Sequence, residues 1–158
     1  MGLYTQQNGK VSLFFGTLCI ILLLSFCYSL GNAKIRQETV SDQRDEILSL
    51  SEKKWKWMMD RQIDSLHVLF DENIVSRQPE IRMDKAGQLD AIKNGNIRYK
   101  HINILETDIQ IVDNISTLLT KVEFNFLGRK ESEIKYVTEV YKKSSNDWKL
   151  ILFQISPV

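Results

Sequence analysis

Hydrophobic and polar residues follow three different patterns along the chain. From Val11 to Leu30 no residue is charged. From about residue 42 to residue 95, apolar residues recur every three or four positions, which is the spacing of a helix that buries one face. Beyond residue 97 they alternate with polar residues, as in strands with one buried face. The pattern predicts an apolar leader, then helices, then a sheet.

Residues 1–33 are expected to be a signal peptide or an N-terminal membrane anchor. Lys10 precedes the apolar run, and Gly31-Asn32-Ala33 after it suits signal peptidase. An uncleaved run at residues 11–30 is long enough to span a bilayer, and lipid attachment at Cys27 is a third alternative. Each alternative exports residues 34–158 to the periplasm or the cell exterior.

Residues 34–44 are expected to form a linker before a domain at 45–158. From Asp42 the pattern becomes helical, and the expected helix bends near residues 61–64. The residues of its apolar stripe are Ile47, Leu50, Ser51, Trp55, Met58 and Met59.

Shorter elements follow this helix. Asp64 is expected to cap a second helix. Residues 73–82 are expected to be extended, with Pro79 excluding a central strand. Asp84 is expected to cap a third helix that ends before Gly95.

The second half predicts four long strands that are joined by short turns and are therefore antiparallel. The alternation of apolar and polar residues changes phase within the first predicted strand. This change predicts a β-bulge between Leu105 and Asp108. Bulges bend sheets, so this sheet is expected to curve strongly. The predicted strands are residues 97–112, 115–127, 132–143 and 147–156.

The fold class that follows is α+β, with N-terminal helices packed on a strongly curved antiparallel sheet. Such a sheet has a concave face, which the apolar stripe of the first helix can cover. In the second strand one set of alternating residues is expected to face the interior: Leu118, Thr120, Val122, Phe124 and Phe126.

The composition of the chain excludes several classes of partner and cofactor. Lys10 is the only charged side chain among residues 1–33, so the remaining chain holds 20 basic and 20 acidic residues. This balance argues against nucleic acid or an anionic membrane surface as a partner, so membrane contact is expected only through the leader if it is uncleaved. Both cysteines lie in the leader, and the two histidines are far apart in sequence, so we expect no metal and no cofactor.

Five stretches, in this order and spacing, resemble the nuclear transport factor 2-like superfamily, also called the SnoaL-like or cystatin-like cone fold. The resemblance covers residues 45–157 and is strongest to a bacterial branch without a settled activity. It implies a cone with a central pocket, and the superfamily contains isomerases, dehydratases, cyclases and binding proteins. The stretches are Trp55 to Leu66, Phe70 to Asn73, Met83 to Leu89, Tyr99 to Asp108, and Tyr136 to Ser156.

The function expected is binding of a small apolar or amphipathic molecule, with no catalytic residue. Three polar residues lie in register with apolar ones, where a pocket would place its orienting groups. Trp55, Met59 and Tyr99 are expected to supply an apolar wall, although each is also a natural core residue. The expected ligand-binding residues are Trp55, Met59, Tyr99, Thr120, Thr138 and Gln154.

An isomerase, dehydratase or cyclase is the alternative, and it needs an acid or histidine that points into the pocket. The candidates are Asp108, Glu139, His67 and His101. Glu139 is expected in solvent if its neighbour Val140 faces inward.

A homodimer is also expected, because the outer face of such a sheet can pair two copies. The residues expected on that face are Thr117, Leu119, Val137 and Tyr141.

Overall fold

The computed structural model describes residues 40–158 except 79, 97 and 146. The expected leader therefore lies outside the described residues. Within the described part of the chain, no helix is both long and apolar enough to cross a bilayer. Residues 43–158 form one compact unit.

A long helix at residues 40–60 opens the described chain. The described end of the expected linker, residues 40–44, is part of this helix. It ends at Arg61, whose φ of +53° breaks the helical path, as the sequence predicts. Its buried residues recur at spacings of three and four and form one face: Ile47, Ser51, Lys54, Trp55 and Met58.

The second helix, α2 (Ile63–Leu69), differs from the expectation at its start. Gln62 occupies the N-cap position without a side-chain hydrogen bond, and Asp64 lies in the first turn. The expected Asp64 cap is therefore wrong. The Asp64 carboxylate instead interacts with the positive end of the helix dipole.

A strand, β1 (Phe70–Gln78), follows α2 directly and is succeeded by a short strand, β2 (Ile81–Met83). β1 lies between β2 and the last strand in the sequence, β6 (Asp147–Pro157). The expectation that Pro79 excludes a central strand is wrong, because β1 ends one residue before the proline. The third helix, α3 (Lys85–Lys93), begins as predicted, with the Asp84 carboxylate accepting a hydrogen bond from the Gly87 amide.

Four long strands follow within two residues of their predicted ends. They are β3 (Tyr99–Val112), β4 (Ile115–Phe126), β5 (Ser132–Ser144) and β6 (Asp147–Pro157). Asp113, Gly128 and Ser145 all have positive φ in the connecting turns. Tight hairpins use this left-handed conformation because it matches the twist of the strands.

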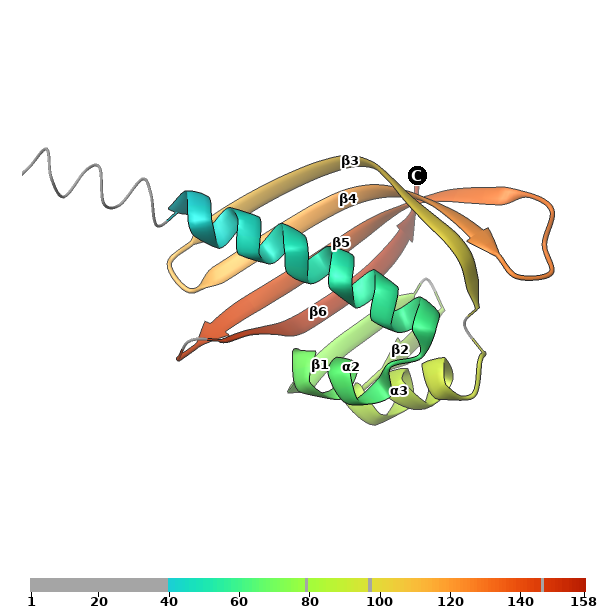
Figure 1. The fold of residues 1–158 in the computed structure, drawn as a ribbon, viewed down its shortest axis with the longest axis horizontal. Coiled ribbons are helices and arrows are strands. Elements are labelled where there is room, and N and C mark those ends of the chain that lie inside the picture. The colour runs from blue at the N-terminus through green and yellow to red at the C-terminus, as the bar shows by residue number, and fades with distance from the viewer. Residues whose placement is uncertain (1–39, 79, 97, 146) are drawn as a thin grey trace, which may run out of the picture. The chain divides into compact units, whose positions relative to one another are not determined.

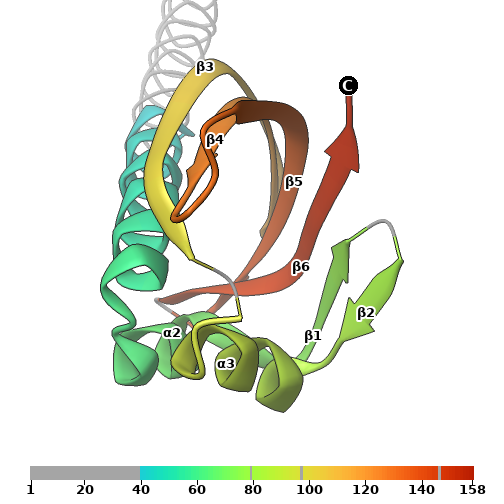
Figure 2. The ribbon, with the colours of Figure 1, turned by 90° about the vertical axis from the view of Figure 1, so that its right-hand side faces the viewer.

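The six strands form one sheet in the order β2-β1-β6-β5-β4-β3. All pairings are antiparallel except β1 with β6. Leu105 is an extra residue in β3 opposite β4, which is the predicted bulge. Figure 2 shows the sheet curling from β2 round to β3, and Figure 1 shows the long helix crossing its concave side.

The β5 strand faces the interior with the opposite set of residues from that expected. Val137, Glu139 and Tyr141 are completely buried, so none of them lies in solvent or on an outer face. Val140 is only partly buried and points outward. Inward and outward residues alternate strictly along a strand. The expectation that Val140 faces inward therefore also reversed Val137, Glu139 and Tyr141.

A second bulge shifts β6. Tyr141 pairs with Leu150 while Val140 pairs with Leu152, which leaves Ile151 as the extra residue. Trp148 and Leu150 therefore face the interior before the bulge, and Phe153 faces it afterwards. Gln154, which was expected to line the pocket, therefore lies on the opposite face from Trp148 and Leu150.

Candidate functional site

The deepest polar group of the interior is an ion pair between the long helix and β5. Lys54 and Glu139 are both completely buried, and Lys54 Nζ lies 2.5 Å from Glu139 Oε1. Ser51 Oγ donates to the same carboxylate oxygen at 3.0 Å, and the Tyr141 hydroxyl donates to the other. Three donors from two elements thus surround one carboxylate.

Aromatic rings enclose the other side of this ion pair. Lys54 Nζ lies 3.6 Å from the ring centroid of Trp55 and 4.6 Å from that of Phe153. Both distances are within the range of a cation–π interaction. The ammonium group is therefore held by one carboxylate and two ring faces.

Burial changes the protonation of this cluster. Desolvation lowers the pKa of Lys54 to about 8, although the Glu139 carboxylate opposes the shift. Desolvation also raises the pKa of Tyr141, and the charge of Glu139 adds to that shift. The tyrosine is therefore neutral at physiological pH and serves as a hydrogen-bond donor.

A second polar region lies at the open end of the curved sheet, where a pocket of about 310 Å³ opens. We call it the mouth pocket. It lies where β3 and β5 begin and where β4 and β6 end. Its lining consists of Gln78, Asn96, Arg98, Tyr99, Phe124, Phe126, Arg129, Glu133, Lys135 and Ile155.

Aromatic rings form the inner wall of the mouth pocket. The centroids of Tyr99 and Phe124 lie 5.3 Å apart, and those of Tyr99 and Phe126 lie 5.6 Å apart. Trp55 packs edge-on against Tyr99 and Phe124 from the interior. Burial raises the pKa of Tyr99, so its phenol is neutral at physiological pH.

Charged side chains form the rim, and most of them are basic. Glu133 is the one carboxylate among the described lining residues, and it pairs with Arg129 at 2.6 Å and Lys135 at 3.4 Å. Arg129 also lies over the Phe126 ring, 5.0 Å from its centroid. Arg98 has no carboxylate partner among the described residues. The rim therefore carries net positive charge.

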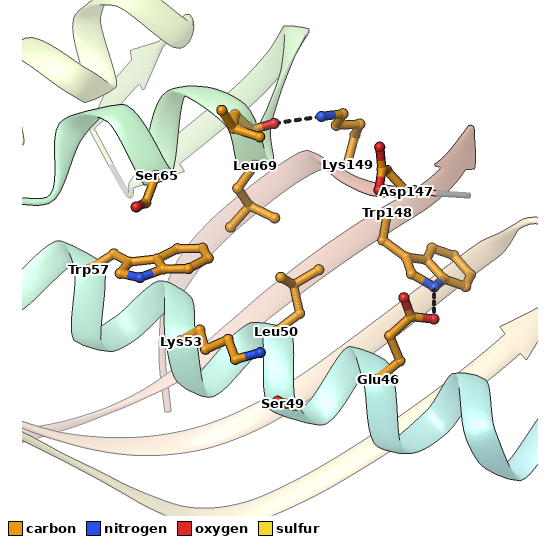
Figure 3. Close-up of a pocket in the computed structure, with 11 residues that line it drawn as sticks. Glu46, Ser49, Leu50, Lys53, Trp57, Ser65, Leu69, Asp147, Trp148 and Lys149 are labelled. Atoms are coloured by element: carbon orange, nitrogen blue, oxygen red, sulfur yellow. Dashed lines mark hydrogen bonds between the residues drawn. The ribbon is translucent and has the colours of Figure 1, made fainter. Parts of the chain in front are cut away.

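A groove of about 290 Å³ lies between the long helix, α2 and the start of β6 (Figure 3). Leu50, Trp57 and Leu69 line it with apolar surface. Two of its polar groups have partners: Trp148 Nε1 donates to Glu46 at 3.0 Å, and Lys149 Nζ donates to the Val68 carbonyl at 2.7 Å. The mouth pocket is the better candidate because three aromatic rings line it beside a rim of net positive charge.

Known structures share this architecture at low sequence identity. No protein-family model matches the sequence, and no curated protein matches it. An NTF2-like protein from Cytophaga hutchinsonii superposes with a TM-score of 0.67 at 19% identity, covering 73% of this chain and 98% of that one. A putative ketosteroid isomerase from Parabacteroides distasonis gives 0.58 at 20% identity, covering 71% and 85%.

The chain has the nuclear transport factor 2-like fold. The association domain of CaMKII from C. elegans shares it, with a TM-score of 0.64 at 14% identity over 73% of this chain and 96% of that one. The neighbours thus include an association domain and a protein described as a putative isomerase. The NTF2-like fold alone therefore assigns no activity.

The NTF2-like fold separates the six residues expected to bind ligand. Trp55 and Thr120 are buried in the interior, and Tyr99 lines the mouth pocket. Thr138 and Gln154 lie directly opposite each other on the outer face of the sheet. Met59 is 37% exposed on the long helix. Only Trp55 and Tyr99 are in contact around the pocket wall.

The four candidates for acid–base chemistry are also separated. Asp108, His67 and His101 are exposed. Glu139 is in the interior but does not line the mouth pocket, and three donors already occupy its oxygens. Among the described residues, no group of three or more histidine, cysteine or acidic side chains could hold a metal ion.

Sequence reasoning missed Lys54 and the basic rim. The expected apolar stripe omits Lys54, although this residue lies seven residues after Ile47 and four before Met58, on the same helical face. That spacing was the available signal. Arg98, Arg129 and Lys135 carry no such signal, because the pairing of β3 with β4 and of β4 with β5 brings their segments together.

Proposed function

We propose that this protein binds a small molecule with a flat apolar body in the mouth pocket. The observation that carries the proposal is the cluster of Tyr99, Phe124 and Phe126 at the inner wall of an open pocket. Its volume of about 310 Å³ is within the usual range for ligand sites. A cavity of roughly 150 Å³ admits benzene, so this pocket is large enough for one or two rings.

Two ligands of equal size test the proposal: 2-naphthoate, which is anionic, and 2-naphthamide, which is neutral. The purified protein is titrated with each while its backbone amide resonances are recorded. We expect shifts concentrated at Tyr99, Phe124 and Phe126. An Ile155→Trp variant, which adds bulk to the lining, should weaken both ligands. Absence of binding by both, or shifts confined to the groove at Leu50 and Trp57, would refute the proposal.

We further propose that the domain is exported, and that residues 1–33 carry the export signal. A fusion of residues 1–33 to alkaline phosphatase tests this, because the enzyme forms its disulfides only outside the cytoplasm. We expect activity, and loss of it when Leu22 and Leu23 are both changed to Arg. The mass of the mature chain distinguishes cleavage from a retained anchor. An inactive fusion would end this proposal.

A second function, pairing of two copies, is favoured by the outer face of the sheet. Thr117, Val140 and Leu152 lie in one row across three strands, and Leu119, beside this row, is 42% exposed. A Leu119→Glu change should convert a dimer to a monomer by light scattering. The matched control is Val112→Glu, at an exposed strand end. A wild-type monomer at high concentration would refute the pairing.

A further inference from the structure

A pair of arginines meets beside the mouth pocket, at the turn between α3 and β3. A Cβ atom placed on Gly95 would lie 2.8 Å from Arg98 Nε, 3.1 Å from Arg98 Nη2 and 2.9 Å from Arg61 Nη2. The two guanidinium groups therefore approach the same point. They can do so because residue 95 is glycine, which has no Cβ and tolerates its φ of +71°.

Neither guanidinium, that of Arg61 or that of Arg98, is neutralised by a carboxylate of residues 40–158, leaving aside the three undescribed positions in that range. Arg98 uses its Nε to donate to the Gly95 carbonyl at 3.0 Å, which fixes the plane of its guanidinium. Its terminal nitrogens remain available. Two adjacent like charges repel each other, and a bound anion would remove that repulsion.

The backbone holds both arginines in place. Arg61 has left-handed backbone geometry where the long helix ends. The Arg98 carbonyl accepts a hydrogen bond from the Leu127 amide at 3.0 Å, which ties the α3–β3 connection to the β4–β5 turn. Arg98 is also a lining residue of the mouth pocket. One side chain thus belongs both to the arginine pair and to the pocket.

We infer that Arg61 and Arg98 form an anion site at the edge of the mouth pocket, and that the ligand is an aromatic or apolar carboxylate. Its flat body packs against Tyr99 and Phe126, and its carboxylate lies between the two guanidinium groups. Planar guanidinium groups bind carboxylates through paired, charge-assisted hydrogen bonds. The inference rests on the proposed function, since it specifies the ligand class of the same pocket.

The matched ligands 2-naphthoate and 2-naphthamide separate this inference from the proposed function. We expect naphthoate to bind about tenfold more tightly at low salt, as charge-assisted hydrogen bonds are stronger than neutral ones. Raising NaCl from about 0.05 M to about 0.5 M should reduce that preference. If the two ligands bound equally, the anion site would be overturned but the proposed binding function of the mouth pocket would stand. If neither ligand bound, both proposals would be overturned.

Three arginine variants locate the site. Arg61→Asn removes one guanidinium and places a residue that tolerates positive φ, so the fold is retained. Arg98→Ala removes the other. Each should lower the preference for naphthoate about threefold to tenfold and leave naphthamide binding within about twofold. Arg82→Ala, at an exposed position on β2, controls for loss of charge. An unchanged preference in Arg61→Asn would overturn the pair as the site.

Glycine variants test the geometry without removing charge. Gly95→Ala places a methyl group where the two guanidinium groups meet and should lower the naphthoate preference. Gly128→Ala is the control for backbone strain, because Gly128 also has positive φ but has no neighbour within 4 Å of its Cβ position. Equal effects of the two changes on the preference would overturn the role of the Gly95 cradle.

Discussion

The interior and the mouth of this domain both contain cations beside aromatic rings, but only the interior cation is buried and paired with a carboxylate. Lys54 lies against Trp55 and Phe153, is completely buried, and has Glu139 as its partner. Arg98 lies beside Tyr99 at the edge of the pocket and has no carboxylate partner among the described residues. A buried charge without a partner would be too unstable to retain, whereas an exposed one is solvated and available for a ligand.

The difference teaches that location decides what a cation does in this fold. The Lys54–Glu139 pair is enclosed by the hydrogen bonds of Ser51 and Tyr141, so it fixes how the long helix sits on β5. In the proposed anion site, the arginines at the mouth select the class of ligand. Changes to the first pair should therefore alter stability, and changes to the second should alter binding.

The largest expected effect is on stability, from Lys54→Met. The change leaves the Glu139 carboxylate buried without a cation, which should cost about 3–5 kcal/mol of unfolding free energy. Unfolding in urea measures this loss. The double variant Lys54→Met with Glu139→Leu should recover much of it, since apolar residues can replace a buried ion pair.

A surface ion pair provides the control for that comparison. Lys56 Nζ lies 3.2 Å from Asp60, four residues away on the same helix, with side chains that are 70% and 45% exposed. Lys56→Met should therefore cost only about 0.5 kcal/mol or less. Similar losses for Lys54→Met and Lys56→Met would contradict the enclosed arrangement of the interior pair.

The second prediction concerns alkaline pH. The folded-state pKa of Lys54 is lowered from 10.5 to about 8, so between these values the unfolded chain binds more protons. Stability should therefore rise with pH in this window, by about 1 kcal/mol between pH 7 and pH 9. Above about pH 10 it should fall, because Tyr99 and Tyr141 have raised pKa values and ionise more readily when unfolded.

Urea unfolding at a series of pH values measures this profile. In Lys54→Met the rise between pH 8 and 10 should disappear, while the fall at higher pH should remain. A wild-type stability that declines from pH 7 to pH 9 would show that the buried lysine does not titrate as described.

The third prediction concerns the aromatic wall of the mouth pocket. Phe126 is partly buried and packs against the Phe124 ring at 6.0 Å. Phe126→Ala should weaken 2-naphthamide about tenfold while costing about 1–2 kcal/mol of stability, less than for a fully buried ring. Titration and urea unfolding of the same variant give both values. Unchanged affinity would show that this wall does not contact the ligand.

Local patterns in the sequence predicted most of the fold. The helical stripe from Ile47 to Met58, the Asp84 cap and the bulge near Leu105 are all determined by neighbouring residues, and each is present. The exception is β1, whose parallel pairing with β6 joins residues far apart in sequence. A proline at its end gave no indication of the strand before it.

The candidate site was much harder to predict. The expectation that Val140 faces inward reverses β5, whose buried Glu139 is the partner of Lys54. The bulge at Ile151 then moved Gln154 to the other side of the sheet. Each error came from an interaction between distant segments, and a single such interaction reverses every later residue of a strand.

The smallest expected effect is at the outer face, where Thr138 and Gln154 face each other. Gln154→Ala and Thr138→Ala should change affinity for 2-naphthoate less than about twofold and stability by no more than about 0.5 kcal/mol. The contrasting variant is Thr120→Val on the inner face. Thr120 is buried and donates to the Val137 carbonyl at 3.4 Å, so its loss should cost about 1 kcal/mol. The side chain at position 154 lies on the convex side of the sheet and cannot reach the mouth pocket through the strand. If Gln154→Ala lowered the affinity as much as Phe126→Ala does, the ligand would have to occupy the convex side.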